Sequence, residues 1–221
     1  SGLDEQNGPG TDGTFDRSFD LRYQILSETD VRPAIAIGLQ DFLGTGYLAS
    51  EYIVATKAVT PQIDVTAGLG WGRLGSRNGF DNPLGTLSDT FSTRPALRNA
   101  AKGEGGQMDA AQFFRGDAAV FGGVSYRYSD KLTFKAEYSS DGYVRETDNG
   151  TLDNRSPINV GLNYTYRPGL DVQLAYLYGS ELAAGATLTL NPRTRLAPSG
   201  RETAPTPVRV RPTDLLPVRD V

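Results

Sequence analysis

The sequence predicts an all-β protein, namely an antiparallel transmembrane β-barrel of the outer-membrane type that is incomplete in this chain. Segments of about ten residues alternate between apolar and polar side chains, which is the period of a β-strand. The connections between these segments alternate between tight turns and long loops, as in membrane barrels. Tyrosine and tryptophan gather near both ends of the segments, where the two interfaces of a membrane select amphipathic rings.

Composition agrees with this fold class and excludes several kinds of site. The chain has 221 residues with 26 glycines, 11 tyrosines and 9 phenylalanines, which suits strands and turns better than helices. It has no cysteine and no histidine, so a Cys/His zinc site, a cysteine nucleophile and a histidine-based triad are excluded, and we expect no cofactor. A net charge of −4 argues against binding of duplex nucleic acid. Since no apolar run approaches about 18 residues, we expect no transmembrane helix.

The strands follow in order along the chain. The clearest alternation marks residues 18–25, 63–72, 132–139, 158–167 and 170–178. Weaker alternation marks residues 34–40, 51–59, 118–128 and 182–190, which brings the total to about nine antiparallel strands. Ten residues tilted by about 40° span about 25 Å, the height of the apolar band of an outer-membrane barrel.

The connections support the same topology. Tight turns are expected at residues 60–62, 129–131 and 168–169, and long loops at 73–117 and 140–157. The first two connections follow the same short-then-long order, because the connection at residues 27–32 is shorter than the one at residues 41–50. We therefore expect tight turns at one end of the barrel and long loops at the other.

The chain is expected to divide into a partial barrel and a linker. Residues 1–191 form the partial barrel, and residues 192–221, which contain six prolines, form a Pro/Arg-rich linker towards a further domain. Residues 1–14 resemble a hairpin loop, so a strand is expected before them. An odd count of nine also predicts further strands, since single-chain bacterial barrels have an even number.

If the apolar side chains contact lipid, the alternate positions line a lumen. The candidates for lumen-lining residues are Asp20, Arg22, Gln24, Glu51, Asp64, Arg127, Lys135, Glu137, Asn159, Asn163, Arg167 and Asp171. The candidates for membrane-interface aromatics are Trp71, Tyr126, Tyr128, Tyr138, Tyr164, Tyr166, Tyr176 and Tyr178. The polar side chains fit two interpretations: weak hydrogen bonding to sugar hydroxyls, or a structural network that fills a narrow barrel. We expect Gly68 and its neighbours to let another group approach the inner wall.

Five segments have a distinctive sequence: Gly-Leu-Gly-Trp-Gly-Arg-Leu-Gly at residues 68–75, and those that begin at Arg17, Pro33, Ser50 and Phe113. They resemble the YjbH-type exopolysaccharide-biosynthesis proteins of Gram-negative bacteria, and the block at residues 68–75 is the most specific part. The resemblance covers residues 17–192 and implies an outer-membrane barrel protein much longer than this chain. It also implies a role in making or exporting an extracellular polysaccharide.

Together, these observations predict a non-enzymatic outer-membrane component of an exopolysaccharide production or secretion system. Its expected partners are outer-membrane lipid, the polysaccharide and other exopolysaccharide-secretion proteins. The alternative is a soluble β-sandwich of the cell envelope that binds carbohydrate. A glycan-cleaving enzyme would need two carboxylates about 5–10 Å apart, with Glu51, Asp64 and Glu137 as candidates. Nothing in the sequence places two of these together.

Overall fold

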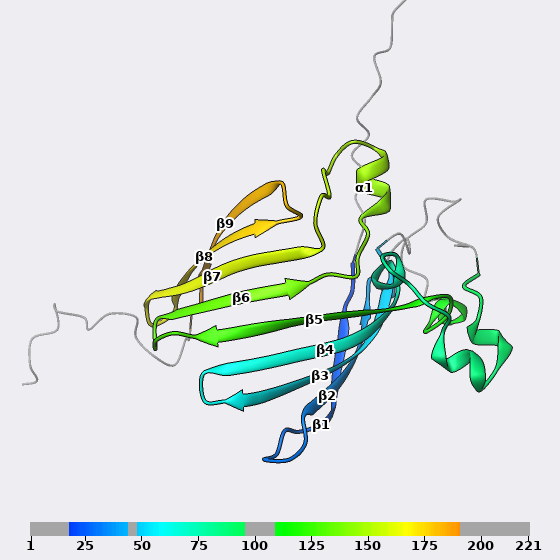
Figure 1. Ribbon diagram of the computed structural model, residues 1–221, viewed down its shortest axis with the longest axis horizontal. Helices are drawn as coiled ribbons and strands as arrows, with labels where there is room; N and C mark the ends of the chain where they lie inside the picture. Colours follow the sequence, from blue (N-terminus) through cyan, green and yellow to red (C-terminus); the bar gives the residue numbers. More distant parts are fainter. Residues whose placement is uncertain (1–17, 44–47, 96–108, 191–221) are drawn as a thin grey trace, which may run out of the picture. The chain divides into compact units, whose positions relative to one another are not determined.

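The computed structural model describes residues 18–43, 48–95 and 109–190 (Figure 1). The chain divides into two units, Ser1–Leu188 and Thr189–Val221. The expected hairpin loop at residues 1–14 and the expected linker at residues 192–221 both lie outside the described residues.

All nine predicted strands are present in the first unit, and the protein is all-β. They form one antiparallel sheet in which each strand pairs with its neighbours in the sequence, in the order β1 to β9. The strands are β1 (Leu21–Leu26), β2 (Ala34–Gln40), β3 (Ser50–Thr60), β4 (Ile63–Gly72), β5 (Ala118–Arg127), β6 (Leu132–Tyr138), β7 (Ile158–Arg167), β8 (Leu170–Leu177) and β9 (Glu181–Leu188).

Helical structure is confined to the connections. A short helix, α1 (Val144–Asp148), lies between β6 and β7, and single 3₁₀ turns occupy Arg73–Gly75, Pro83–Thr86, Asp89–Phe91 and Ala110–Gln112. In the part of the chain that the structure describes, no helix has the length and apolar character needed to cross a membrane.

The three tight turns and the two long loops lie where the sequence predicts them, although β8 and β9 are joined at the long-loop end by only three residues, 178–180. β3, β5 and β7 each lead into the next strand through a tight turn, whereas β4 and β6 lead into long connections. The turn between β7 and β8 uses Gly169 at φ 84°, a left-handed conformation that glycine adopts without steric cost.

The register divides the side chains into two faces. Directly paired residues share a face, so the pairs Ile53↔Leu69 and Leu69↔Val120 continue one apolar row across three strands. The row runs on over the remaining strands. This apolar face consists of Leu21, Tyr23, Ile35, Ile37, Ile53, Val65, Leu69, Val120, Val124, Phe134, Val160, Leu162, Leu174, Tyr176 and Leu182.

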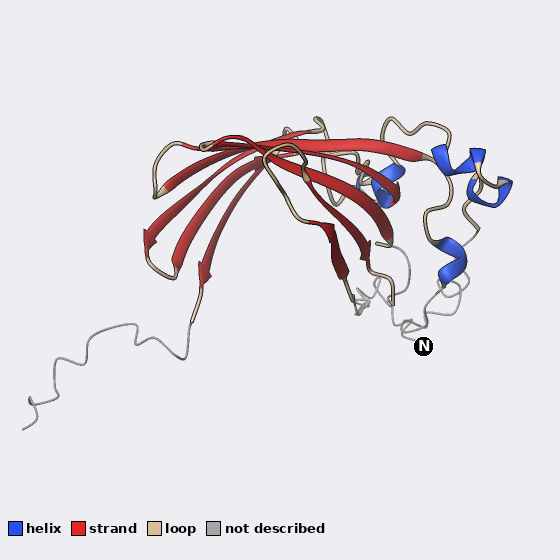
Figure 2. Ribbon diagram, turned by 90° about the horizontal axis from the view of Figure 1, so that it is seen from below, coloured by secondary structure: helices blue, strands red, loops and turns tan. Residues whose placement is uncertain are grey.

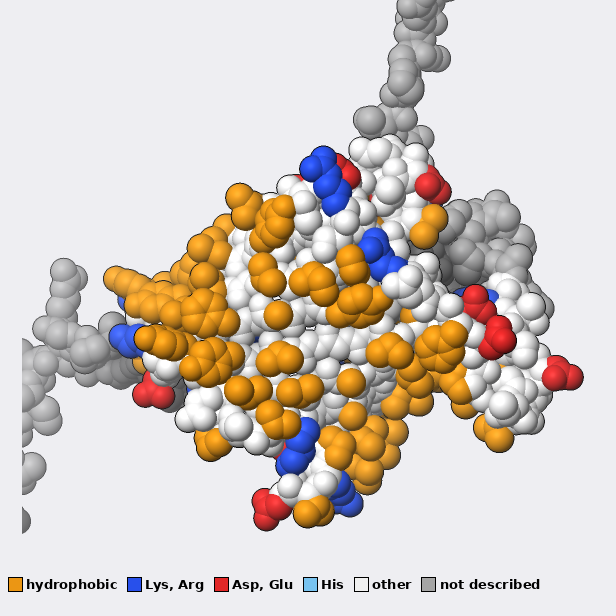
Figure 3. Space-filling model, in the orientation of Figure 1, with side chains coloured by type: hydrophobic (Ala, Val, Ile, Leu, Met, Phe, Trp, Pro, Cys, Tyr) orange, Lys and Arg blue, Asp and Glu red, His pale blue; other side chains and the backbone are white. Residues whose placement is uncertain are grey.

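The sheet is curved and open. Figure 2 shows the strands arched, and Figure 3 shows apolar side chains spread over the convex side. The edge strands β1 and β9 pair only with β2 and β8 within the described residues, so the sheet does not close there. The described residues therefore form a nine-stranded antiparallel sheet that is not closed into a barrel.

The most deeply buried side chains lie at the long-loop end of the sheet, where the connections fold over the strand ends. Trp71, Glu51, Ser50 and Ser140 are the largest fully buried side chains. Most large apolar side chains of the apolar face are exposed instead, for example Val120 at 52% and Leu174 at 49%. The described sheet consequently has no second layer packed against that face.

Candidate functional site

The candidate site is the concave face of the sheet, which carries the polar residues that alternate with the apolar face. We call it the polar face. Its members include Arg22, Gln24, Tyr52, Thr56, Asp64, Thr66, Phe121, Lys135, Glu137, Asn159, Asn163, Asp171 and Gln173.

Two aromatic rings lie on the polar face, each over a glycine. A Cβ at Gly38 would overlap the Tyr52 ring, and a Cβ at Gly68 would overlap the Phe121 ring. The two rings meet edge to face with centroids 6.2 Å apart. The expectation that Gly68 lets another side chain approach is confirmed by Phe121, whereas the position of this face as the inner wall of a barrel stays a prediction.

Hydrogen bonds connect neighbouring strands across the polar face. The Thr56 and Thr66 hydroxyls lie 2.9 Å apart. The Thr165 hydroxyl donates to the Asp171 carboxylate at 2.6 Å, and the Asn159 amide nitrogen donates to Glu137 at 3.3 Å. Each of these bonds joins two neighbouring strands, so the polar face is an ordered hydrogen-bonding surface.

The register puts most of the predicted lumen-lining residues on the polar face: Arg22, Gln24, Asp64, Arg127, Lys135, Glu137, Asn159, Asn163 and Asp171. Asp20 precedes β1, and its carboxylate accepts a hydrogen bond from the Asp41 amide at 2.9 Å. Arg167 lies beyond the register shift at the end of β7. A lumen role for these residues stays a prediction.

Glu51 was expected to line the lumen, and its position differs. It pairs with Trp71 and shares the face of Ile53, while Tyr52 lies on the polar face. The Glu51 side chain is 2% exposed and accepts hydrogen bonds from Arg94 at 2.7 and 3.0 Å. Since Arg94 belongs to the β4–β5 connection, this ion pair anchors that connection to β3. The pairing also offsets the desolvation of the buried carboxylate.

Trp71 was expected to anchor the chain at a membrane interface, and its ring instead lies inside the protein. It is 1% exposed and packs edge to face against Phe114, with the ring centroids 5.2 Å apart. Phe114 belongs to the long connection that folds over the end of β4. Trp71 therefore helps to fasten this connection and has no open face for lipid or sugar.

The remaining aromatics lie near the two ends of the strands. At the tight-turn end, Tyr126, Tyr128, Tyr164 and Tyr166 are exposed, and Tyr128 meets Tyr126 and Phe134 edge to face. At the long-loop end, the Tyr138 hydroxyl accepts a hydrogen bond from Asn78 at 2.7 Å and the Tyr176 hydroxyl donates to Gly179 at 2.5 Å. Tyr178 packs on Tyr143. Their contact with a membrane stays a prediction.

An ionic and aromatic cluster joins three connections at the long-loop end. Arg73 pairs with Asp141 and, at 2.7 Å, with Glu146 of α1. Its guanidinium lies 4.9 Å from the Tyr143 ring centre, and that ring contacts Tyr178 at 4.7 Å. This cluster could not be predicted from local sequence patterns, because its members come from three separate connections.

Charge and burial shift the pKa values of this cluster. Burial and the neighbouring Tyr178 raise the pKa of the Tyr143 phenol, which stays neutral. Burial acts to raise the pKa of Glu146, but the hydrogen bond from Arg73, a backbone hydrogen bond and the nearby positive charges together outweigh it, and the net pKa is lowered. Burial likewise opposes the charge of Arg73, and its two carboxylate partners raise its pKa despite this.

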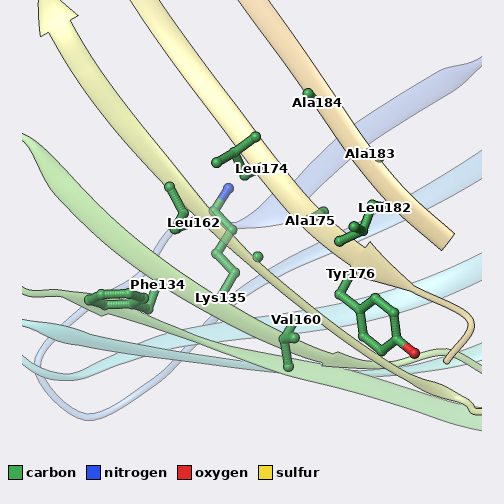
Figure 4. A pocket seen from close by; sticks show the side chains of 11 residues that line it. Phe134, Lys135, Val160, Leu162, Leu174, Ala175, Tyr176, Leu182, Ala183 and Ala184 are labelled. Atoms are coloured by element: carbon green, nitrogen blue, oxygen red, sulfur yellow. The ribbon is translucent and has the colours of Figure 1, made fainter. Parts of the chain in front are cut away.

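The apolar face is hollowed where β6 to β9 meet. A hollow of about 690 Å³ is lined mainly by large side chains of β6, β7 and β8 and by alanines of β9. Figure 4 shows Phe134, Leu162, Leu174 and Tyr176 projecting from neighbouring strands around it. Because its lining is almost wholly apolar, this hollow suits hydrocarbon better than sugar.

Among the described residues, no group of three or more acidic side chains is placed to hold a metal ion.

Residues 2–219 match the family described as exopolysaccharide biosynthesis protein YbjH. The uncharacterized lipoprotein YjbH of Escherichia coli (strain K12) is 37% identical over 202 residues. The chain belongs to the YjbH family. The aligned region is 91% of this chain and 28% of the E. coli protein, so the chain spans just over a quarter of that curated relative. No solved structure matches it.

In this YjbH-family chain, the block at residues 68–75 that carried the resemblance builds the long-loop end of the sheet. Gly68 admits Phe121, Trp71 packs on Phe114, and Arg73 anchors α1. Gly70 lies against Leu74 of the following turn. The contacts of residues 68–75 therefore hold the long connections against the ends of the strands.

Proposed function

We propose that this chain is part of an outer-membrane β-barrel that contributes to the production or export of an exopolysaccharide. The apolar face contacts lipid in this proposal and the polar face lines the lumen. The observation that carries it is the apolar face itself, which continues over nine strands and is exposed. An apolar surface of this extent on a single sheet is typical of a membrane or protein interaction site.

Strand lengths and directions support the proposal. β3, β4, β5 and β7 have 10 or 11 residues, the length of a tilted membrane-spanning strand. β1 and β9 run in the same direction, because eight antiparallel steps separate them. A closed antiparallel barrel built on this sheet consequently needs an odd number of strands beyond these nine.

The alternative, a soluble β-sandwich that binds carbohydrate, requires a second sheet against the apolar face. All nine described strands belong to one sheet, so the described part of the chain does not supply that second layer. The lipoprotein relative favours a location in the cell envelope, and the outer membrane is our proposal within it.

We also propose that the chain is not an enzyme. Glu51 is buried in its pair with Arg94 on the face opposite to Glu137. Asp64 and Glu137 share the polar face but lie on β4 and β6, with β5 between them. The described structure therefore separates these three candidate carboxylates, which disfavours glycosidase chemistry by any two of them.

Two substitutions in β7 test the membrane proposal. Leu162→Arg puts a charge on the apolar face, where a lipid midplane costs about 2–4 kcal/mol, and should cripple folding of the full-length protein into lipid vesicles. Asn163→Arg, the matched control, puts the same charge on the polar face and should fold normally. Equal folding of both variants would contradict the proposal.

A deletion tests the biological role. Loss of the full-length protein should abolish surface polysaccharide while cytoplasmic precursors persist, and Asn163→Arg but not Leu162→Arg should restore it. Normal secretion in the deletion strain would refute the role in export.

A further inference from the structure

A hollow of about 420 Å³ opens on the polar face over β1, β2 and β3. Its lining residues are Arg22, Gln24, Ala34, Ala36, Val54 and Thr56. The small side chains of β2 form its floor, because Gln24 pairs with Ala36 and Thr56 pairs with Ala34. Polar groups therefore stand at both rims of a cavity whose volume is typical of small-ligand sites.

An aromatic ring lies beside this hollow. Gly38, the register partner of Arg22, is covered by the half-buried Tyr52 ring. A pyranose ring presents C–H groups that pack on an aromatic face, while its hydroxyls need hydrogen-bonding partners. The Gln24 amide nitrogen donates to the Leu26 carbonyl and the Thr56 hydroxyl bonds Thr66. The Gln24 Oε1 atom and the Thr56 oxygen keep acceptor capacity for sugar hydroxyls on opposite rims of the hollow.

The charge of Arg22 is uncompensated. Elsewhere on the polar face the carboxylates have partners: Asp64 lies 3.9 Å from Arg127, Glu137 accepts from Asn159 and Asp171 accepts from Thr165. Among the described residues, Lys135 on β6 is a second cation of this face without a partner, but it does not line this hollow. The Arg22 side chain is exposed and makes no hydrogen bond or ion pair with any residue that the structure describes. The hollow consequently presents a free guanidinium, which binds carboxylates through two parallel hydrogen bonds.

We propose that this hollow binds an acidic sugar residue, with its carboxylate on Arg22 and its hydroxyls on Gln24 and Thr56. The inference rests on the proposed function, which brings a polysaccharide to this face, and it adds the chemical class of that polysaccharide. A uronic-acid polymer fits the site, whereas a neutral glucan leaves Arg22 without a counter-charge.

Titration of the full-length protein in detergent with two probes tests the site. Tetragalacturonate should bind about tenfold or more tightly than maltotetraose, a neutral tetrasaccharide, and its affinity should fall as salt is added. Arg22→Gln should abolish this preference and Arg22→Lys should keep part of it. Lys131→Gln, which removes one positive charge from the β5–β6 turn, should leave it intact.

Equal affinity of the two probes for the wild-type protein would overturn the proposal, and so would a preference that survives in Arg22→Gln. Displacement of tetragalacturonate by an equal concentration of inorganic phosphate would also overturn it, because it would indicate a general anion site. The wild-type comparisons decide the matter even if Arg22→Gln fails to fold.

This test separates the two proposals. A protein that enters lipid and supports secretion, but binds both probes equally, loses only the acidic-sugar site. A protein that prefers tetragalacturonate through Arg22, but does not enter lipid, keeps the site and loses the membrane role.

Discussion

Arg94 holds the Glu51 carboxylate through hydrogen bonds of 2.7 and 3.0 Å, and the Phe114 amide donates a third of 3.0 Å to the same group. Arg94 and Phe114 lie on opposite sides of residues 96–108 in the β4–β5 connection. One buried carboxylate on β3 therefore fastens both arms of the longest connection in the sheet.

Glu51→Gln should lower the free energy of unfolding of the full-length protein by about 3 kcal/mol, because removal of one member of a buried pair leaves the other uncompensated. Urea unfolding in detergent measures this change, and limited proteolysis should show faster cleavage of the β4–β5 connection. Asp64→Asn is the control, since its pair with Arg127 spans 3.9 Å and is largely exposed. It should cost about 0–1 kcal/mol. Equal losses in both variants would contradict the anchoring role of Glu51.

Trp71 is the single tryptophan of this chain and gives a direct optical test of the loop packing. In the isolated chain refolded in detergent, its emission should be blue-shifted and resist quenching by acrylamide and by brominated acyl chains, since the ring is buried against Phe114. Phe114→Ala should shift the emission to the red. Strong quenching by brominated acyl chains in the wild-type chain would restore the interpretation of Trp71 as an interface anchor.

Gly38→Ala should destabilise the sheet, because the added methyl group overlaps the Tyr52 ring. Overpacking of this kind costs about 1–3 kcal/mol in urea unfolding. Gly185→Ala is a matched control on β9, where an added Cβ would meet only Gln173 Oε1 at 4.0 Å. Equal losses of unfolding free energy in the two variants would contradict the close approach of the Tyr52 ring to β2.

Acid should loosen the tether of α1. Hydrogen bonding to Arg73 lowers the pKa of Glu146 from its ordinary 4.5, despite the opposing effect of burial. A lowered folded-state pKa contributes stability that is present above pH 4.5 and is lost as the pH falls through the lowered value. Since Glu146 is partly exposed, Glu146→Gln should cost about 0.5 kcal/mol at neutral pH. The difference from wild type should vanish in acid, and a difference independent of pH would contradict this assignment.

Where the alternation is regular, both the strand and the face of each side chain could be predicted from the sequence. Where it is irregular, the strand could be predicted but the orientation of its side chains could not. The segment from Ile63 to Gly72 alternates throughout and forms β4 as expected. The segment from Glu51 to Lys57 carries apolar residues on both faces, so its orientation depends on the register of Tyr52 against Gly38 and Gly70. That register depends on pairing with other strands, so it cannot be predicted from the periodicity of this segment alone.

The burial of Trp71 and the Arg73 cluster also depend on distant partners. Trp71 sits at the end of a regular strand, and its alternation correctly gives the apolar face. Only the fold of the connection that carries Phe114 removes it from the surface. Sequence periodicity predicts faces and leaves the packing of long loops undetermined.

The contact of the apolar face with hydrocarbon is tested most directly by a nitroxide scan of residues 158–165 in β7. The chain has no cysteine, so single cysteines placed in an otherwise cysteine-free full-length protein label one position each. In lipid vesicles, labels at 158, 160, 162 and 164 should be relaxed by oxygen, which concentrates in acyl chains, and labels at 159, 161, 163 and 165 by a water-soluble nickel chelate. Immobile labels on the apolar face that neither reagent reaches would show that protein covers it, and would contradict the account.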